Sequence, residues 1–347
     1  MFFASDNSGP VHPEIMASLA EANTGYAMAY GDDEIMDRVR DRIHEIFEAP
    51  EAAVYLVATG TAANSLALAS YANPWQGIYC SPVSHINVDE CNAPEFYSGG
   101  AKLVHVGSDD KMSAEELRAA VAGTVEGDVH VAQRGPVSVT QVTERGRVYT
   151  LDELQGLSAV AKEHGLPVHL DGARFSNALV ALGCTAAEMT WKAGVDVVSF
   201  GGTKNGCMGV EAVVLFDPDK AWEFELRRKR GAHLFSKHRY LSAQMAAYLT
   251  DDLWKRSATQ ANAACARLAD GLRDVDGVVF QVEPQANMIF VDMPRALHQR
   301  LQQQGAKYAI WGDWQTGAPD EMLMSRLVCD WSMTDALIDQ FLEIARG

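Results

Sequence analysis

The stretch PVHLDGAR (residues 167–174) ends a short apolar run on Asp171, directly before a glycine. A second stretch, VDVVSFGGTK (residues 195–204), leads from an apolar run to Lys204. An unpaired charge at the end of a buried strand is costly, so we expect each of these side chains to face a specific partner. The two stretches therefore predict two neighbouring strands whose ends carry an aspartate and a lysine.

Short apolar runs alternate with helical patterns through the first two thirds of the chain. The seven candidate strands cover residues 53–58, 77–81, 102–106, 137–141, 167–171, 195–201 and 211–216. The main helical patterns between them cover residues 62–72, 113–122, 151–164 and 185–193. Three of these helices begin with a capping box, formed by Ser113 with Glu116, Thr150 with Glu153, and Thr185 with Glu188. Apolar strands separated by helices predict an α/β domain with a mostly parallel seven-stranded sheet, whose ligands bind beyond the carboxyl ends of the strands.

The pattern changes from about residue 219 onward. Helical segments at 220–230, 240–249 and 259–273 lead into a region of short candidate strands. These strands cover residues 278–282, 287–293, 308–311 and 323–329, with one helix at 295–304 and a last helix at 334–345. We therefore predict a large domain at 1–244 and a smaller α+β domain at 245–347.

The chain of 347 residues carries a net charge of −17. Such an acidic chain is not suited to nucleic acid or to an anionic membrane surface, apart from a basic cluster at 227–230. No apolar run reaches the length of a membrane span, and the first residues lack the pattern of a signal peptide. The six cysteines form no Cys-x-x-Cys pair and no zinc-like spacing, which predicts reduced thiols in a cytoplasmic protein. No metal-ligand cluster is evident, so no metal-binding residue is assigned, and the sequence does not decide whether the protein depends on a metal.

An aspartate and a lysine on neighbouring strand ends are typical of a pyridoxal phosphate site. The lysine forms a Schiff base with the cofactor, and the aspartate keeps the pyridine nitrogen protonated. The segment TGTAAN (residues 59–64) follows a strand and opens a helix, so Gly60 and Thr61 offer hydrogen-bond donors to a phosphate group. The alternatives are a solvated Lys204 and a purely structural glycine turn.

Three further side chains are candidates for the same site. His85 follows a predicted strand and could stack on a planar cofactor, although a lone histidine is often a hydrogen-bonded core residue. Arg174 and Arg326 lie beside apolar runs, and each could hold a substrate carboxylate or form an internal ion pair. His169 alternates with Asp171 along its strand and therefore shares its face.

These motifs together resemble those of the threonine aldolases, a group within the fold-type-I pyridoxal phosphate enzymes. The resemblance runs nearly from end to end through the segments ASD (4–6), AYGDD (29–33), TGTAAN (59–64), SH (84–85), CNAPEF (91–96), DGAR (171–174), FGGTKNG (200–206) and SR (325–326). The segments CNAPEF and FGGTKNG are similar to the bacterial low-specificity L-type branch. The resemblance implies an aspartate-aminotransferase-like large domain and a homotetramer, a dimer of dimers with shared active sites.

The resemblance also implies a role for each candidate residue. Lys204 would hold the cofactor, Asp171 would pair with the pyridine nitrogen, and His85 would stack on the ring. Further cofactor contacts would come from Gly60, Thr61, Arg174, Thr203 and, from a neighbouring subunit, Lys229. The substrate would contact Ser5, Tyr30, Thr143, Arg174 and Arg326.

One segment departs from the family pattern. Many relatives carry Glu-Asn-Thr-His after the strand that matches 137–139, whereas this chain has TQVTE at 140–144. Thr143 takes the place of a histidine that lies near the substrate hydroxyl in the family. His85, a water molecule or Glu144 could supply that contact instead, and the sequence does not choose between them.

The activity implied by the resemblance is cleavage of L-β-hydroxy-α-amino acids to glycine and an aldehyde. L-Threonine, L-allo-threonine and phenylserine are all plausible substrates. Other reactions of the same cofactor remain alternatives: β-elimination, amino transfer and hydroxymethyl transfer. A non-catalytic scaffold that binds pyridoxal phosphate is a further alternative from a different class.

Overall fold

The computed structural model describes the whole chain, residues 1–347. Its larger sheet has seven strands in the order β1-β7-β6-β5-β4-β2-β3. The strands are β1 (Ala53–Val57), β2 (Gln76–Cys80), β3 (Lys102–His105), β4 (Gln133–Thr140), β5 (Val168–Gly172), β6 (Val197–Gly201) and β7 (Glu211–Leu215). Only β7 runs antiparallel to its neighbours, so the predicted α/β domain with a mostly parallel seven-stranded sheet is confirmed.

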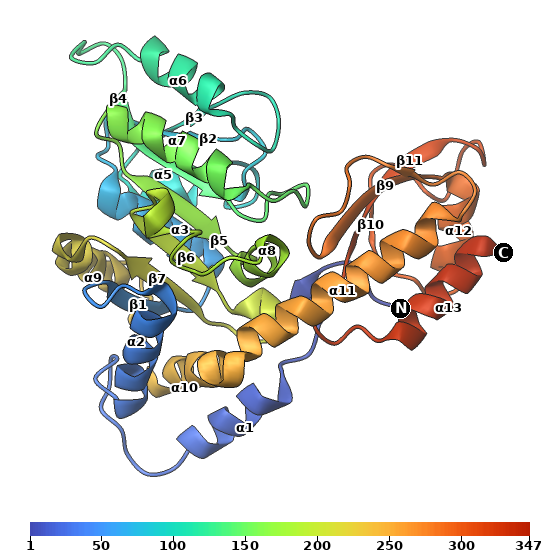
Figure 1. Cartoon of the computed structure of the whole chain (residues 1–347), viewed down its shortest axis with the longest axis horizontal. Coiled ribbons are helices and arrows are strands. Elements are labelled where there is room, and N and C mark those ends of the chain that lie inside the picture. The colour runs from blue at the N-terminus through green and yellow to red at the C-terminus, as the bar shows by residue number, and fades with distance from the viewer.

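Helices surround this sheet and bury both of its faces (Figure 1). They are α1 (Pro13–Ala22), α2 (Glu34–Phe47), α3 (Gly60–Tyr71), α4 (His85–Val88), α5 (Ala93–Tyr97), α6 (Ala114–Gly123), α7 (Leu151–Glu163), α8 (Phe175–Leu182), α9 (Ala221–Arg230) and α10 (Arg239–Leu249). Successive residues of one strand enter different cores, because side chains of a strand alternate between the two faces. Leu56 packs into the main core, whereas Val57 packs against α3 and α9 in a smaller one.

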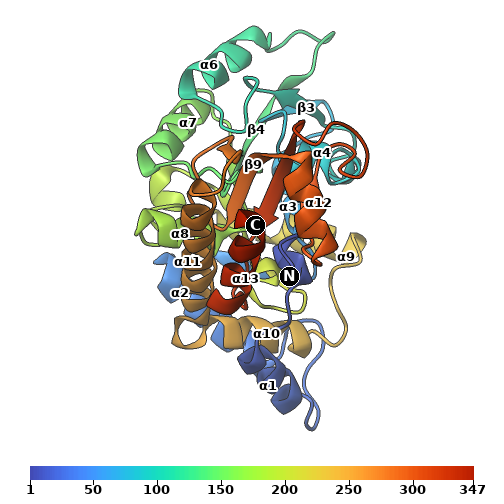
Figure 2. The same ribbon diagram turned by 90° about the vertical axis from the view of Figure 1, so that its right-hand side faces the viewer.

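A four-stranded antiparallel sheet forms the smaller part, in the order β10-β11-β9-β8. Its elements are β8 (Val279–Phe280), β9 (Met288–Pro294), α12 (Arg295–Gln303), β10 (Ala309–Ile310), β11 (Met322–Val328) and α13 (Asp335–Arg346). Figure 2 shows β9 beside α12 and α13 on the side that faces the viewer. This arrangement confirms the smaller α+β domain expected from the sequence.

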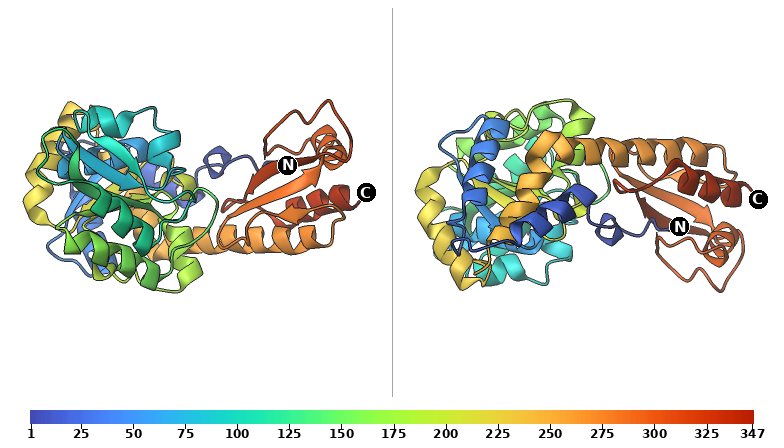
Figure 3. Two further views of the ribbon diagram at one scale, coloured as in Figure 1. Left: turned by 90° about the horizontal axis from the view of Figure 1, so that it is seen from above. Right: turned by 90° about the horizontal axis from the view of Figure 1, so that it is seen from below.

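A single helix, α11 (Leu253–Arg273), connects the two parts (Figure 3). Leu253 and Trp254 belong to the core of the large domain, whereas Leu268 and Leu272 belong to the core of the small one. The first residues of the chain join the small domain too, because Phe3 packs into its core. The predicted boundary between residues 244 and 245 stays a prediction. None of the helices has the length and apolar character that crossing a bilayer requires.

The helix predicted at 185–193 is not formed. Thr185 and Glu188 do make both capping hydrogen bonds, but the segment continues as turns and a short 3-10 helix, η2 (Trp191–Ala193). The Thr190 hydroxyl donates to the Ala186 carbonyl oxygen, and the Thr190 backbone leaves the helical region at φ −123° and ψ −108°. Local hydrogen bonds of this kind compete with a regular helix.

Two glycines allow the ends of β5 and β6 to approach closely. A side chain at Gly172 would place its Cβ 2.6 Å from the Ser199 carbonyl oxygen. A side chain at Gly201 would place its Cβ 2.5 Å from the carbonyl oxygen of Ala173. Both distances are shorter than real contacts, so only glycine permits this approach without movement of the backbone.

Replacing Gly201 should therefore destabilise the fold. We expect Gly201→Ala to lower the free energy of unfolding by about 1–3 kcal/mol, because the added methyl group meets backbone atoms. Gly123→Ala is the matched control, since a Cβ at Gly123 meets nothing within 4 Å. Urea unfolding of both variants measures the difference, and equal stability of the two would contradict the steric argument.

Candidate active site

A cavity of about 260 Å³ lies where the carboxyl ends of β1, β5 and β6 meet. The side chains and backbone that line it are Asn7, Ala58, Thr59, Gly60, Thr61, Asn64, His85, Asp171, Ala173, Thr203, Lys204 and Glu211. Six of these were expected from the sequence, namely Gly60, Thr61, His85, Asp171, Thr203 and Lys204. The structure thus brings together residues from six separate segments of the chain.

Asp171 is held rigidly at the end of β5. It is almost completely buried, and its register partners are Thr140 on β4 and Ser199 on β6. One carboxylate oxygen accepts from the backbone N–H of Ala173 at 3.0 Å, and the other accepts from Nδ2 of Asn64 at 2.9 Å. These hydrogen bonds fix the orientation of the carboxylate that faces the cavity.

His85 is fixed by a buried carboxylate. Its Nδ1 lies 2.8 Å from Oε1 of Glu90, and the same oxygen accepts from Nδ2 of Asn64 at 2.9 Å. The hydrogen bond to Glu90 raises the pKa of His85 above its ordinary value. Asn64 therefore connects the histidine and the aspartate through one network, which also sets the plane of the imidazole ring.

The N-terminus of α3 supplies donors for an anion. Thr59 caps the helix, and its hydroxyl accepts from the N–H of Ala62. The N–H groups of the first helical turn have no acceptor within the helix, so those of Gly60 and Thr61 are available. A Cβ at Gly60 would meet nothing within 4 Å, so the space in front of this turn is open.

Lys204 lies on a short 3-10 turn, η3 (Thr203–Asn205), directly after β6. The amide Nδ2 of Asn205 anchors this turn in the core, because it donates to the Trp254 carbonyl oxygen and to the Tyr248 hydroxyl. Gly206 ends the turn at φ 111°, in the left-handed region that favours glycine. The anchored turn leaves the Lys204 side chain to line the cavity.

Glu211 is a buried carboxyl group beside this turn. Its Oε2 accepts from the N–H of Gly202 at 2.7 Å. Burial raises the pKa of Glu211 to about 7, against the lowering effect of its hydrogen bonds and of the charge on Lys204.

Arg174 forms a buried ion pair with Asp6. Its Nε and Nη2 atoms donate to the two carboxylate oxygens of Asp6 at 2.7 and 2.9 Å. The bidentate fork expected for a substrate carboxylate is therefore already occupied by a side chain of the protein. The charge of Arg174 lowers the pKa of Asp6 despite the opposing effect of burial.

Arg326 has a free donor instead. Its Nη2 donates to the Ala4 carbonyl oxygen at 3.2 Å, while its buried Nε has no partner. A buried donor without an acceptor is costly, and an anion would satisfy it. Ser5 lies next to this contact, and its hydroxyl accepts from the N–H of Asn7.

Tyr30 and Lys229 do not line the cavity of their own chain. They contact each other on the surface, where Nζ of Lys229 lies 5.1 Å from the centre of the Tyr30 ring. The Tyr30 side chain is 46% exposed, and its backbone has a positive φ of 63°.

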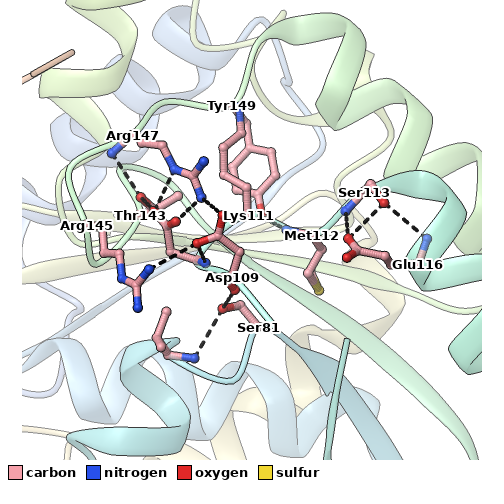
Figure 4. Close-up of polar contacts among 12 residues, drawn as sticks. Ser81, Asp109, Lys111, Met112, Ser113, Glu116, Thr143, Arg145, Arg147 and Tyr149 are labelled. Carbon is pink, nitrogen blue, oxygen red and sulfur yellow. Dashed lines mark hydrogen bonds and ion pairs between the residues drawn. The ribbon is translucent and has the colours of Figure 1, made fainter. Parts of the chain in front are cut away.

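Thr143 is completely buried and is not among the residues that line the cavity. Its hydroxyl donates to Asp110 and accepts from the backbone N–H of Arg147 at 3.0 Å. Figure 4 shows Thr143 in a network with Arg147, Asp109 and Arg145. In this arrangement Thr143 is part of the loop structure and not a lining residue. Burial raises the pKa of the neighbouring Glu144, against the lowering effect of the charges on Arg174 and Lys204.

His169 is a core residue. Its ring nitrogens lie 3.0 and 3.1 Å from the hydroxyls of Ser138 and Ser199. Burial lowers its pKa to about 4, so the ring is neutral at physiological pH. It supports the strand that carries Asp171 without a direct hydrogen bond to that carboxylate.

Four residues of the site were not assigned a role from the sequence: Asp6, Asn64, Glu90 and Glu211. One sequence feature pointed to Asn64. It lies four residues after Gly60, so the two residues share one face of helix α3. Asp6 and Glu90 are polar residues in segments without any regular period. Only contacts between distant segments identify them.

The buried Glu211 should make stability depend on pH. Its folded pKa of about 7 lies above the ordinary value of 4.5, so its contribution to stability is fully present below pH 4.5 and is lost as pH rises through 7. Relative to Glu211→Gln, we expect the free energy of unfolding to fall by about 2–3 kcal/mol between pH 4.5 and 8. Urea unfolding at several pH values measures this.

Glu343→Gln is the control, because Glu343 is exposed on α13. Its difference from wild type should not vary over this pH range. If the free energies of unfolding of Glu211→Gln and wild type change in parallel between pH 4.5 and 8, Glu211 is ionised throughout this range.

Comparison with known proteins gives consistent results. The family model described as beta-eliminating lyase matches residues 3–294. The low specificity L-threonine aldolase of Pseudomonas aeruginosa is 41% identical over 346 residues, which is 99% of this chain and 96% of that protein. A second low specificity L-threonine aldolase, from a Pseudomonas species, is 40% identical over 97% of this chain and 94% of its own length.

Solved structures agree with this assignment. A threonine aldolase of Leishmania major is similar with a TM-score of 0.91 and 26% identity, over 99% of this chain and 98% of that one. A serine palmitoyltransferase of Sphingomonas wittichii shares the fold with a TM-score of 0.71 at 18% identity, over 100% of this chain and 86% of that one. The chain therefore belongs to the beta-eliminating lyase family, within the group that includes the low specificity L-threonine aldolases.

Proposed function

We propose that this chain is a pyridoxal-phosphate-dependent aldolase that cleaves L-threonine and related L-β-hydroxy-α-amino acids to glycine and an aldehyde. The observation that carries the proposal is the cavity in which Lys204, Asp171 and the N-terminus of α3 meet. The chain's near full-length similarity to threonine aldolases supports this reaction over amino transfer or elimination.

The residues of the cavity fit the cofactor. The free N–H groups of Gly60 and Thr61 suit a phosphate group, since a helix N-terminus attracts anions. Asp171 offers a buried carboxylate for the protonated pyridine nitrogen, and Lys204 offers an amine for the cofactor aldehyde. His85, with its ring held by Glu90, suits contact with the cofactor ring.

Substrate binding is proposed to rest on Arg326. Its unpartnered Nε is a buried donor, and the ion pair of Arg174 with Asp6 lies close enough for both charges to act on its guanidinium group. The substrate carboxylate would be oriented there, with Ser5 at the edge of the same contact. This orientation fixes which bond at Cα stands perpendicular to the cofactor plane.

When bound, pyridoxal phosphate supplies a carbonyl group for the substrate amine and a ring that takes up the electron pair of the broken Cα–Cβ bond. Asp171 would hold the proton on the pyridine nitrogen, which makes the ring a better electron acceptor. The Lys204 amine would move a proton at Cα when glycine forms. His85 or Glu144 would accept the proton of the β-hydroxyl, since Thr143 faces Asp110 instead.

The first test is a substitution of Lys204. We expect Lys204→Ala to lose the yellow absorbance of bound cofactor and to lower glycine release from threonine by about 10³-fold or more, because the attachment point is gone. Absorbance spectroscopy and a coupled assay for glycine measure the two effects.

Lys102→Ala is the control, because Lys102 is exposed at the start of β3. It should retain both colour and activity. A wild-type protein that stays colourless with added cofactor would overturn the proposal, and ammonia or a keto acid in place of glycine and aldehyde would point to elimination or amino transfer.

We further propose a homotetramer in the cytoplasm, in which the partner subunit's Lys229 contacts the cofactor phosphate and the partner subunit's Tyr30 lines the substrate pocket. Both residues are exposed and lie outside the cavity of their own chain. Tyr26, Met28 and Phe235, which are near them along the chain, are exposed apolar side chains as well, as expected of an interface. The six cysteines are free thiols, which fits a reducing compartment.

Complementation between subunits tests the sharing of sites. We expect Lys229→Ala alone to weaken cofactor binding by about tenfold, because a charged hydrogen bond is lost. Co-expression of Lys204→Ala with Lys229→Ala subunits should restore activity, since a mixed pair contains one site with both lysines. Size-exclusion chromatography with light scattering gives the assembly, and activity no higher than that of the separate variants would argue against shared sites.

A further inference from the structure

Glu211 is a buried carboxyl group in the wall of the proposed active site, and the proposed reaction gives it no role. It is 6% exposed and lines the same cavity as Lys204. Its Oε2 accepts from the backbone N–H of Gly202 at 2.7 Å. A buried carboxyl group costs free energy unless partners compensate for it, so the groups around Glu211 decide what it does.

The topology of the sheet places Glu211 between two parts of the cavity. β7 runs antiparallel to both of its neighbours, so its first residue lies at the edge where β1 and β6 end. Glu211 is the register partner of Val57 on β1 and of Gly201 on β6. The chain continues from β1 into the turn at Gly60, and from β6 to Lys204. Glu211 therefore lies between the turn proposed to hold the phosphate and the amine proposed to hold the cofactor aldehyde.

Lys204 has three carboxyl groups close enough for its charge to act on their pKa, those of Asp6, Glu144 and Glu211. Asp6 is occupied by Arg174, which donates to both of its oxygens. Neither Asp6 nor Glu144 lines the cavity of the lysine, whereas Glu211 does. Of the three, Glu211 is therefore the carboxyl group that shares a cavity with the lysine amine.

The surroundings of Glu211 hold it between its two charge states. Burial disfavours the carboxylate, whereas hydrogen bonds from Thr203 and Gly202 and the charge of Lys204 favour it. The balance puts the pKa of Glu211 at about 7. A carboxyl group in this position can both take up and release a proton at neutral pH.

The ionisable side chains packed behind Glu211 stay neutral at such pH values. Burial raises the pKa of Cys207, which follows η3, and of Tyr248 on α10. On the other side, β1 and the first turns of α3 contribute no ionisable side chain to the cavity.

Two further ionisable groups of the cavity are committed to other partners. Asp171 has both carboxylate oxygens in hydrogen bonds. His85 is held by Glu90, with 2.8 Å between Nδ1 and Oε1. Lys204 is therefore the group of the cavity with which Glu211 can exchange a proton.

We propose that Glu211 is the base that removes a proton from the Lys204 ammonium group before the amine bonds to the cofactor. The inference rests on the proposed function and adds a catalytic residue to it. The four-carbon stem of Lys204 is flexible, so its amine can reach Glu211 and the cofactor aldehyde in turn. A lysine amine is a nucleophile only in its neutral form, which the proton transfer supplies.

The step balances in protons and charge. Lys204 gives one proton to the Glu211 carboxylate, which leaves a neutral amine and a neutral carboxyl group. The amine nitrogen then bonds to the aldehyde carbon and releases the carbonyl oxygen as water, together with its own two remaining protons. The neutral carboxyl group also avoids repulsion with the phosphate proposed to lie at Gly60 and Thr61.

The rate of cofactor attachment tests this role. Full-length protein free of cofactor is mixed with pyridoxal phosphate, and the yellow absorbance is followed by stopped flow at several pH values. For wild type, the rate constant should rise as pH increases through about 7, because Glu211 must be ionised to accept the proton. Glu211→Gln should lower the rate constant at about pH 8 by about 100-fold and remove this rise.

Two further variants complete the comparison. Glu211→Asp keeps a carboxyl group and should keep the rise with pH. Glu343→Gln is the matched control, because Glu343 is exposed on α13, and it should behave as wild type does. Equal rate constants and equal pH profiles for wild type and Glu211→Gln would overturn the role of Glu211.

Infrared difference spectroscopy gives a second readout, which needs only the wild-type protein. Addition of pyridoxal phosphate at about pH 8 should produce the C=O band of a protonated carboxyl group, and heavy water should shift this band. Glu211→Gln should lack it. Wild-type protein that turns yellow without this band would contradict the proton transfer.

The outcomes separate this inference from the proposed function. Wild-type protein that turns yellow and releases glycine from threonine, with unchanged attachment in Glu211→Gln, would overturn the role of Glu211 and leave the aldolase function intact. Wild-type protein that stays colourless with added cofactor would overturn the proposed function, and the role of Glu211 with it.

Discussion

The buried carboxylate of Asp6 is the point at which three distant parts of the chain meet. It accepts two hydrogen bonds from Arg174 at the start of α8 and one from Asn287 just before β9. Three residues earlier, Phe3 packs into the core of the small domain. Removal of one partner from such a buried ion pair typically costs about 3–5 kcal/mol. Asp6 therefore ties the domains together and fixes Arg326 of the small domain relative to Lys204 of the large one.

The charged groups of the site are arranged so that few of them lack a partner. Asp171, Asn64, Glu90 and His85 form one continuous chain of hydrogen bonds. In a buried environment such a network is stronger than the same contacts in water, and it holds each group in one orientation. The exceptions include the buried Nε of Arg326 and Oε2 of Glu90, which have no hydrogen-bond partner within the chain.

Local sequence was sufficient for most of the secondary structure. All seven strands of the large sheet follow from short apolar runs, and the capping boxes of α6 and α7 both form. The segment 185–193 failed as a helix because Thr190 bonds to its own backbone neighbours, which a pattern of apolar residues does not reveal. Helix α8 was missed for a different reason: it is only eight residues long and its polar residues Ser176 and Asn177 are buried, so no exposed polar face marks a helical period.

Roles of single residues were harder to derive. Arg174 and Arg326 look alike in the sequence, yet one is paired with Asp6 and the other has a free donor. Thr143 stands at the position of a substrate contact in related sequences, but Asp110 takes its hydroxyl. In each case the decisive partner lies far away along the chain, so its identity depends on how the loops pack.

The sequence by itself determined that Asp171 and Lys204 end neighbouring buried strands, because hydrophobic runs and the turn residues after them are local properties. It also indicated the cofactor and the family. Only the tertiary structure decided that Asn64 and Glu90 link Asp171 to His85, that Arg174 is paired with Asp6, and that an aromatic cavity opens beside Arg326. These features are contacts between segments of both domains, and packing selects them from many pairings that the sequence alone would allow.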